Sequence, residues 1–164
     1  MDALKRKTCC FTGHRKIAEE TLEELGEVIE SSIEKFVMTG ITVYRAGGAL
    51  GFDTLAAEKV LKLRGTHPEI KLELILPCRD QTKGWSAEDV QKYERIISEA
   101  DRVTFLHDKY VRGCMHERNR ALVDGSIVCL AYCTSGTGGT AYTVDYAKKT
   151  DVCVINLARL LKRI

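Results

Sequence analysis

The chain has 164 residues, 45% of them hydrophobic and 29% charged, so it can bury the core of one domain and is not a disordered polymer. Lys and Arg number 25 against 23 Asp and Glu, and the resulting net charge of +2 argues against nucleic acid or an anionic membrane as a partner held by overall charge. No apolar run approaches the roughly 20 residues that span a bilayer, and the first residues lack the apolar stretch of a signal peptide. We therefore expect one cytoplasmic domain over residues 1–164, with no membrane partner.

Short apolar runs alternate with longer amphipathic stretches along the whole chain. The runs are rich in β-branched residues and are followed by turn formers, which is typical of strands. They predict six strands, at residues 8–12, 42–46, 72–76, 102–106, 127–132 and 152–155.

Between these runs, apolar residues recur at spacings of three and four, which is typical of helices that pack one face on a core. We expect a long helix through 22–36, a second that Asp53 caps and that ends near 64, and a third after the capping box Ser86-Ala-Glu-Asp89. Two more are expected over about 115–124 and from about Thr140. The alternation predicts an α/β, Rossmann-like domain with a mainly parallel sheet of about six strands and helices on both faces.

Glycines gather where three predicted strands run into helices, and ligands of open parallel sheets bind beyond that edge. The three turns are Gly13-His14-Arg15, the run from Gly47 and Gly48 to Gly51 and Asp53, and the run from Gly136 through Gly138 and Gly139 to Thr140. Glycine lets backbone N–H groups approach an anion, and the following helix N-terminus adds donors and partial positive charge. We therefore predict a phosphate-binding loop at 136–140, with a flexible surface loop as the alternative. For 47–53 the alternative is tight packing of strand against helix.

Further polar and aromatic candidates lie at the same edge. Arg118 and Asn119 begin the helix after the fourth strand, where Arg118 can bind phosphate through two parallel hydrogen bonds or can belong to a solvated face. Gln81 and Trp85 follow the third strand, and Trp85 can stack on a base or cover the core. The glycine runs match neither GxGxxG nor GxxxxGK[ST], which argues against a dinucleotide dehydrogenase or a P-loop ATPase.

The seven cysteines are an odd number without a CxxC pair, which favours reduced, mostly buried thiols. A zinc site built from Cys10, His14, Cys114 and His116 is the alternative, but structural zinc sites usually have closer ligand pairs. The sequence therefore predicts no bound metal, and no motif in it requires a cofactor.

Four ordered motifs together resemble the YpsA-like branch of the SLOG superfamily over nearly the whole chain. They are residues 10–15 (CFTGHR), residues 47–58 (GGALGFDTLAAE), the series Pro77, Gln81, Trp85 and Tyr93, and residues 138–140 (GGT). The superfamily includes Lonely-guy phosphoribohydrolases, DprA-type binders of single-stranded DNA and proposed nucleotide sensors. The resemblance implies a Rossmann-like fold and a nucleotide-like ligand related to AMP or ADP-ribose, and it leaves a homodimer open.

The resemblance also transfers the catalytic arginine of Lonely-guy enzymes to Arg118 and the threonine of their glycine loop to Thr140. Their catalytic glutamate corresponds to Thr143 here, and the next carboxylate, Asp145, would point to another side of the helix. Asp53, Glu58 and Glu117 are substitutes that no spacing distinguishes. The sequence therefore favours nucleotide binding over a reaction, and the resemblance implies a role as a ligand sensor.

Two alternatives follow from the same superfamily. One is a phosphoribohydrolase that uses Arg118 to hydrolyse the N-glycosidic bond of a nucleoside monophosphate. The other is a DprA-like module for single-stranded nucleic acid, which the aromatic content of 7% and the low net charge disfavour.

Overall fold

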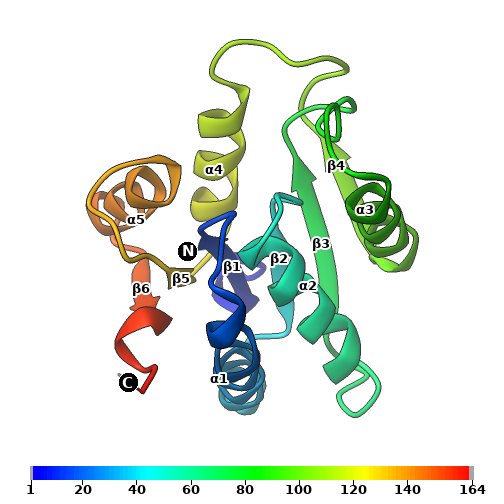
Figure 1. Ribbon diagram of the computed structural model, residues 1–164. Helices are drawn as coiled ribbons and strands as arrows, with labels where there is room; N and C mark the ends of the chain where they lie inside the picture. Colours follow the sequence, from blue (N-terminus) through cyan, green and yellow to red (C-terminus); the bar gives the residue numbers. More distant parts are fainter. Residues whose placement is uncertain (1, 163–164) are drawn as a thin grey trace.

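One parallel sheet organises the computed structural model, which describes residues 2–162 (Figure 1). Residues 1, 163 and 164 of the expected domain lie outside the described residues. Within them the sheet has six strands: β1 (Thr8–Gly13), β2 (Val43–Ala46), β3 (Lys71–Leu76), β4 (Arg102–Phe105), β5 (Val128–Tyr132) and β6 (Cys153–Asn156). Each predicted strand is confirmed to within one residue at either end.

The strand order reverses at β1, which pairs with β2 on one side and with β5 on the other. The full order is β4-β3-β2-β1-β5-β6, so the chain first winds outward from β1 to β4. It then returns across the sheet through α4 (Cys114–Asp124) and continues to β5 and β6. Open parallel sheets bind ligands at such a reversal, beyond the carboxyl ends of the strands.

Helices cover both faces of the sheet (Figure 1). Three pack along one face, α1 (Glu19–Met38), α2 (Phe52–Leu63) and α3 (Ala87–Glu99), while α4 and α5 (Gly139–Lys149) pack on the other. The predicted α/β Rossmann-like class is therefore confirmed. No helix within residues 2–162 combines the length and apolarity needed to cross a membrane.

Strand alternation divides the core into two layers. Cys9 and Phe11 of β1 join the layer under α1 and α2, whereas Cys10 between them joins the layer under α4 and α5. Successive side chains of a strand point to opposite faces, so β1 is buried on both sides. This explains why residues 9–11 in the middle of β1 are apolar without interruption.

Two helix-capping residues were predicted, Ser86 and Asp53, and the second prediction is wrong. The Ser86 hydroxyl caps α3 by accepting a hydrogen bond from the Asp89 N–H at 3.1 Å, as expected. Asp53 does not cap α2, because the N-cap is Gly51 and Asp53 lies inside the first turn. The loop must pass so close to the β1–α1 loop that a Cβ on Gly51 would lie 2.2 Å from the Arg15 carbonyl oxygen.

We expect Gly51→Ala to lower the free energy of unfolding by about 3 kcal/mol. About 1 kcal/mol comes from the positive φ of 76° and about 2 kcal/mol from the close approach to Arg15. Gly84→Ala is the matched control, because Gly84 has a φ of 85° with open space around its Cβ position, and it should cost only about 1 kcal/mol. Urea denaturation measures both, and equal losses would show that the close approach at Gly51 is unimportant.

Candidate functional site

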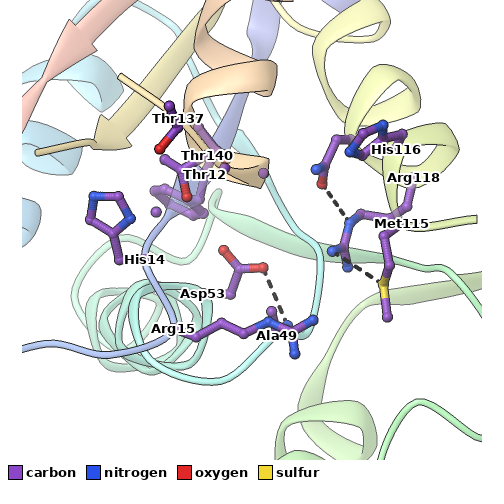
Figure 2. Close-up of a pocket in the computed structure, with 15 residues that line it drawn as sticks. Thr12, His14, Arg15, Ala49, Asp53, Met115, His116, Arg118, Thr137 and Thr140 are labelled. Carbon is purple, nitrogen blue, oxygen red and sulfur yellow. Dashed lines mark hydrogen bonds between the residues drawn. The ribbon is translucent and has the colours of Figure 1, made fainter. Parts of the chain in front are cut away.

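A cavity of about 290 Å³ opens at the point where the strand order reverses, beyond the carboxyl end of β1 (Figure 2). Residues 11–15, the start of α2, the first turns of α4 and the loop before α5 form its wall. The structure brings together at this cavity the predicted residues Gly13, His14, Arg15, Asp53, Arg118, Asn119, Gly138, Gly139 and Thr140. Four chain segments far apart in the sequence therefore meet at one place.

Other predicted site residues lie outside the wall of the cavity. Gly47 packs on Arg118, since a Cβ there would lie 2.7 Å from the Arg118 Nη1 atom, and a Cβ on Gly48 would lie 2.4 Å from Leu76. Gly51 packs on the β1–α1 loop. Close packing, the alternative stated for residues 47–53, thus accounts for these three glycines. Gly136 lies in the exposed β5–α5 loop, with open space around it and two residues before Gly138.

Gln81 and Trp85 follow β3, two strands away from β1 in the sheet. The Gln81 side chain is buried and its Nε2 donates to the Gly47 carbonyl at 3.4 Å, and Gln81 does not line the cavity. Trp85 packs edge-on against Tyr93, with ring centroids 5.5 Å apart. The structure gives Trp85 a packing contact and does not bring it to the cavity.

Six residues of the wall were not predicted from the sequence. Each of them lies beside a predicted residue or within one helical turn of it, and they are Phe11, Thr12, Ala49, Met115, His116 and Thr137. Adjacency in the sequence could have indicated Thr12 and Thr137. No sequence signal distinguishes Ala49, whose contribution is a backbone N–H.

The N-terminus of α5 presents unused backbone donors to the cavity. Its N-cap is Gly138, with a φ of 96°, and no side chain caps the helix. The first backbone N–H of α5 that donates within the helix is that of Tyr142, to the Gly138 carbonyl at 3.0 Å. A Cβ on Gly138 or Gly139 would meet no atom within 4 Å, so the approach to these donors is unobstructed. Uncapped donors and the helix dipole make this end of α5 suited to an anion.

Arg118 projects from the first turns of α4, and it is only 4% exposed. Its contacts hold the side chain in place. Its guanidinium donates to the Gly47 carbonyl and, at 2.7 Å, to the Asn119 Oδ1 atom, while Nη2 lies 3.8 Å from the Met115 sulfur (Figure 2). Burial lowers the pKa of Arg118 and the charge of Asp53 opposes that shift. Since arginine stays protonated in proteins, the cavity has a fixed cation in its wall.

Asp53 supplies a carboxylate to the same cavity and is 6% exposed. Its Oδ2 atom accepts a hydrogen bond from the Ala49 N–H at 3.2 Å. Burial raises the pKa of the Asp53 carboxyl, whereas the Arg118 charge, the Ala49 N–H and the Arg15 charge lower it. The wall therefore carries two guanidinium groups against one carboxylate, a balance that favours an anionic ligand.

The other carboxylates considered from the sequence lie elsewhere. Glu58 pairs with Arg95 at 3.4 Å between α2 and α3, and Glu117 contacts His107 at 2.7 Å. Asp145 borders a different hollow, on the far side of the β5–α5 loop. Thr143 is buried and donates its hydroxyl to the Gly139 carbonyl at 2.9 Å. Of the carboxylates in the described residues, Asp53 alone lines the cavity.

The residues of the zinc alternative have separate surroundings. Cys10 lies in the core beside Cys129, and the His116 ring stacks on Tyr142 with centroids 4.0 Å apart. The His14 Nε2 atom accepts a hydrogen bond from the Thr134 N–H at 2.8 Å, which ties the end of β1 to the β5–α5 loop. Residues 2–162 contain no cluster of three metal-ligating side chains. All seven cysteines are free, and five are buried.

Comparison with known proteins places this geometry in a family. Residues 10–155 match the YpsA family model, described as the YspA SLOG family. The chain is 33% identical over 144 residues to YoqJ, an SPbeta prophage-derived protein of Bacillus subtilis, covering 79% of this chain and 84% of YoqJ. It is 31% identical over 128 residues to a UPF0398 protein of Halalkalibacterium halodurans, covering 75% of this chain and 67% of that protein.

Two solved structures of DNA processing protein A share the fold. The protein from Helicobacter pylori, described for its single-stranded DNA binding mode, has a TM-score of 0.66 at 17% identity, covering 92% of this chain and 64% of that one. The protein from Streptococcus pneumoniae has a TM-score of 0.64 at 16% identity, covering 92% and 50%. The chain therefore spans only part of either protein, and the likeness concerns the fold.

We expect Gly47→Ala to lower the free energy of unfolding by about 2 kcal/mol, because the new methyl group would displace the Arg118 guanidinium. In an Arg118→Ala background the same change should cost less than about 0.5 kcal/mol, since the obstructing group is gone. Urea denaturation of the wild-type protein, the two single variants and the double variant gives the coupling free energy between residues 47 and 118. Gly136→Ala, which adds a methyl group in open space, is the control and should stay within about 0.5 kcal/mol in both backgrounds. Additive losses for Gly47→Ala and Arg118→Ala would contradict the packing of Arg118 on Gly47.

Proposed function

Because the chain belongs to the YpsA family of SLOG proteins, we propose that it binds a nucleotide or nucleotide derivative in the cavity beyond the carboxyl end of β1 and acts as a ligand sensor. Family membership and the DprA-like fold support a nucleotide- or nucleic-acid-binding module as the broader class. The finer choice of a small phosphorylated ligand rests on the cavity itself.

The observation that carries the proposal is the uncapped N-terminus of α5, which faces the cavity with open space around Gly138 and Gly139. A phosphate bound there accepts hydrogen bonds from the first backbone N–H groups of α5 and gains from the helix dipole. The Thr140 hydroxyl lies in the same wall and adds a donor. Arg15, which follows β1, and Arg118, which lies in α4, both line the cavity and would neutralise the ligand charge.

A ligand-binding role agrees better with the site than hydrolysis does. Thr143 occupies the position that the Lonely-guy resemblance assigns to the catalytic glutamate, and its hydroxyl is engaged with Gly139. Asp53 is the carboxylate of the cavity that could activate a water molecule, and it lies in α2, whereas Thr143 lies in α5. Hydrolysis of the N-glycosidic bond therefore stands as the second candidate, and it would depend on Asp53.

The proposal predicts that AMP and related nucleotides raise the melting temperature of the protein. A ligand at 100 times its dissociation constant adds about 2.7 kcal/mol of stability, which is a rise of several degrees for a chain of this size. Gly139→Asp should weaken AMP binding at least about tenfold, because the new carboxylate repels phosphate at the α5 N-terminus. Gly40→Asp adds the same charge in open space after α1 and should leave the affinity unchanged.

A panel of AMP, ADP, ADP-ribose, NAD and a short oligonucleotide separates the candidates in one experiment. A shift with nucleotides that disappears in Gly139→Asp supports the proposal. Release of free base from AMP by the wild-type protein would favour hydrolysis instead. Salt-sensitive binding of the oligonucleotide alone would favour a single-stranded nucleic-acid module, as in the Helicobacter pylori protein. No shift with any ligand would overturn the site.

A further inference from the structure

The cavity contains one buried carboxylate that phosphate binding does not use. The Ala49 N–H donates to the Asp53 Oδ2 atom at 3.2 Å, and a backbone hydrogen bond from Gly47 also lowers the pKa of this carboxyl. Figure 2 shows the other carboxylate oxygen turned away from Ala49, toward the side of the cavity where Thr12 and Thr140 lie. A carboxylate oxygen that faces the cavity can accept a hydrogen bond from a ligand, and a hydrogen bond to a charged group contributes binding free energy.

The surrounding charges restrict what kind of donor can bind to Asp53. Arg15 and Arg118 line the same cavity, and both lower the pKa of the carboxyl, so both act on it electrostatically. They would repel an ammonium or another cationic group on a ligand. A neutral hydroxyl adds no charge and still donates a strong hydrogen bond to a carboxylate. Two adjacent hydroxyls can each donate to the carboxylate at once.

The cavity volume restricts the size of the ligand. Small-molecule pockets usually occupy roughly 300–1,000 Å³, and about 290 Å³ lies at the lower end of that range. A sugar phosphate fits inside such a space, and a larger ligand would extend out of its open side. The start of α5 and the start of α2, which carries Asp53, line the same cavity, so a phosphate bound at α5 would place its sugar within reach of that space.

We propose that Asp53 binds the vicinal 2′- and 3′-hydroxyls of a ribonucleoside 5′-monophosphate, so that the site selects ribonucleotides over 2′-deoxyribonucleotides. The proposal rests on the nucleotide-binding function stated above and names the ligand class of that same site. Asp53 acts as a specificity-determining residue, and its contribution requires no bond breaking.

The test compares AMP with 2′-deoxy-AMP by titration calorimetry on the wild-type protein. We expect AMP to bind at least about tenfold more tightly, which is the effect of losing one hydrogen bond to a charged group. Equal affinities would overturn the selection of ribose while leaving the nucleotide-binding function intact. Absence of binding by both nucleotides would overturn that function, and this proposal with it.

The Asp53→Asn variant tests whether the preference for AMP over 2′-deoxy-AMP depends on this carboxylate. Its amide oxygen still accepts the Ala49 N–H, but the variant loses the charged acceptor for the diol, so the preference for AMP should fall to within about twofold. Asp145→Asn removes a carboxylate from the separate hollow beyond the β5–α5 loop and should keep the full preference. A preference that persists in Asp53→Asn would overturn the role of Asp53. If that variant does not fold, Asp53→Ser provides the same comparison.

Discussion

The pairing of β1 with both β2 and β5 is the constraint on which the rest of the molecule depends. It buries β1 on both faces and both edges, so every side chain from Thr8 to Thr12 is enclosed. It also sends the two neighbouring connections to opposite faces of the sheet, α1 on one and α4 on the other. A space therefore opens beyond the carboxyl end of β1, and the candidate site lies in that space.

The buried positive charge of Arg118 depends on nearby hydrogen-bond acceptors. Arg118 is nearly inaccessible, yet the Gly47 carbonyl and the Asn119 side chain accept its N–H groups, and Asp53 lies close enough to affect its pKa. A buried guanidinium without such partners would be strongly destabilising. Fixing the cation in advance reduces the entropy that a ligand must lose on binding, because the arginine is already ordered.

Glycines serve two different physical purposes in the same edge of the sheet. Gly13, Gly47 and Gly51 make room for neighbouring groups, since a Cβ on any of them would overlap Phe52, Arg118 or the Arg15 backbone. Gly138 and Gly139 have no such neighbours and leave the α5 donors uncovered. A sequence shows both kinds as the same letter in the same kind of turn. Only the distances to their neighbours separate packing from access.

The sequence by itself determined the elements and their class. Apolar periodicity placed all six strands within one residue and located five helices, because alternation and helical spacing are local properties of the chain. It also placed Gly13, Asp53, Arg118 and Thr140 at one edge, since strand-to-helix turns of a parallel sheet share an edge. It could not separate Asp53 from Glu58, five residues later in the same helix, nor show that Trp85 packs on Tyr93. Those distinctions required the tertiary structure, because strand order and helix rotation decide which side chains reach the space beyond β1.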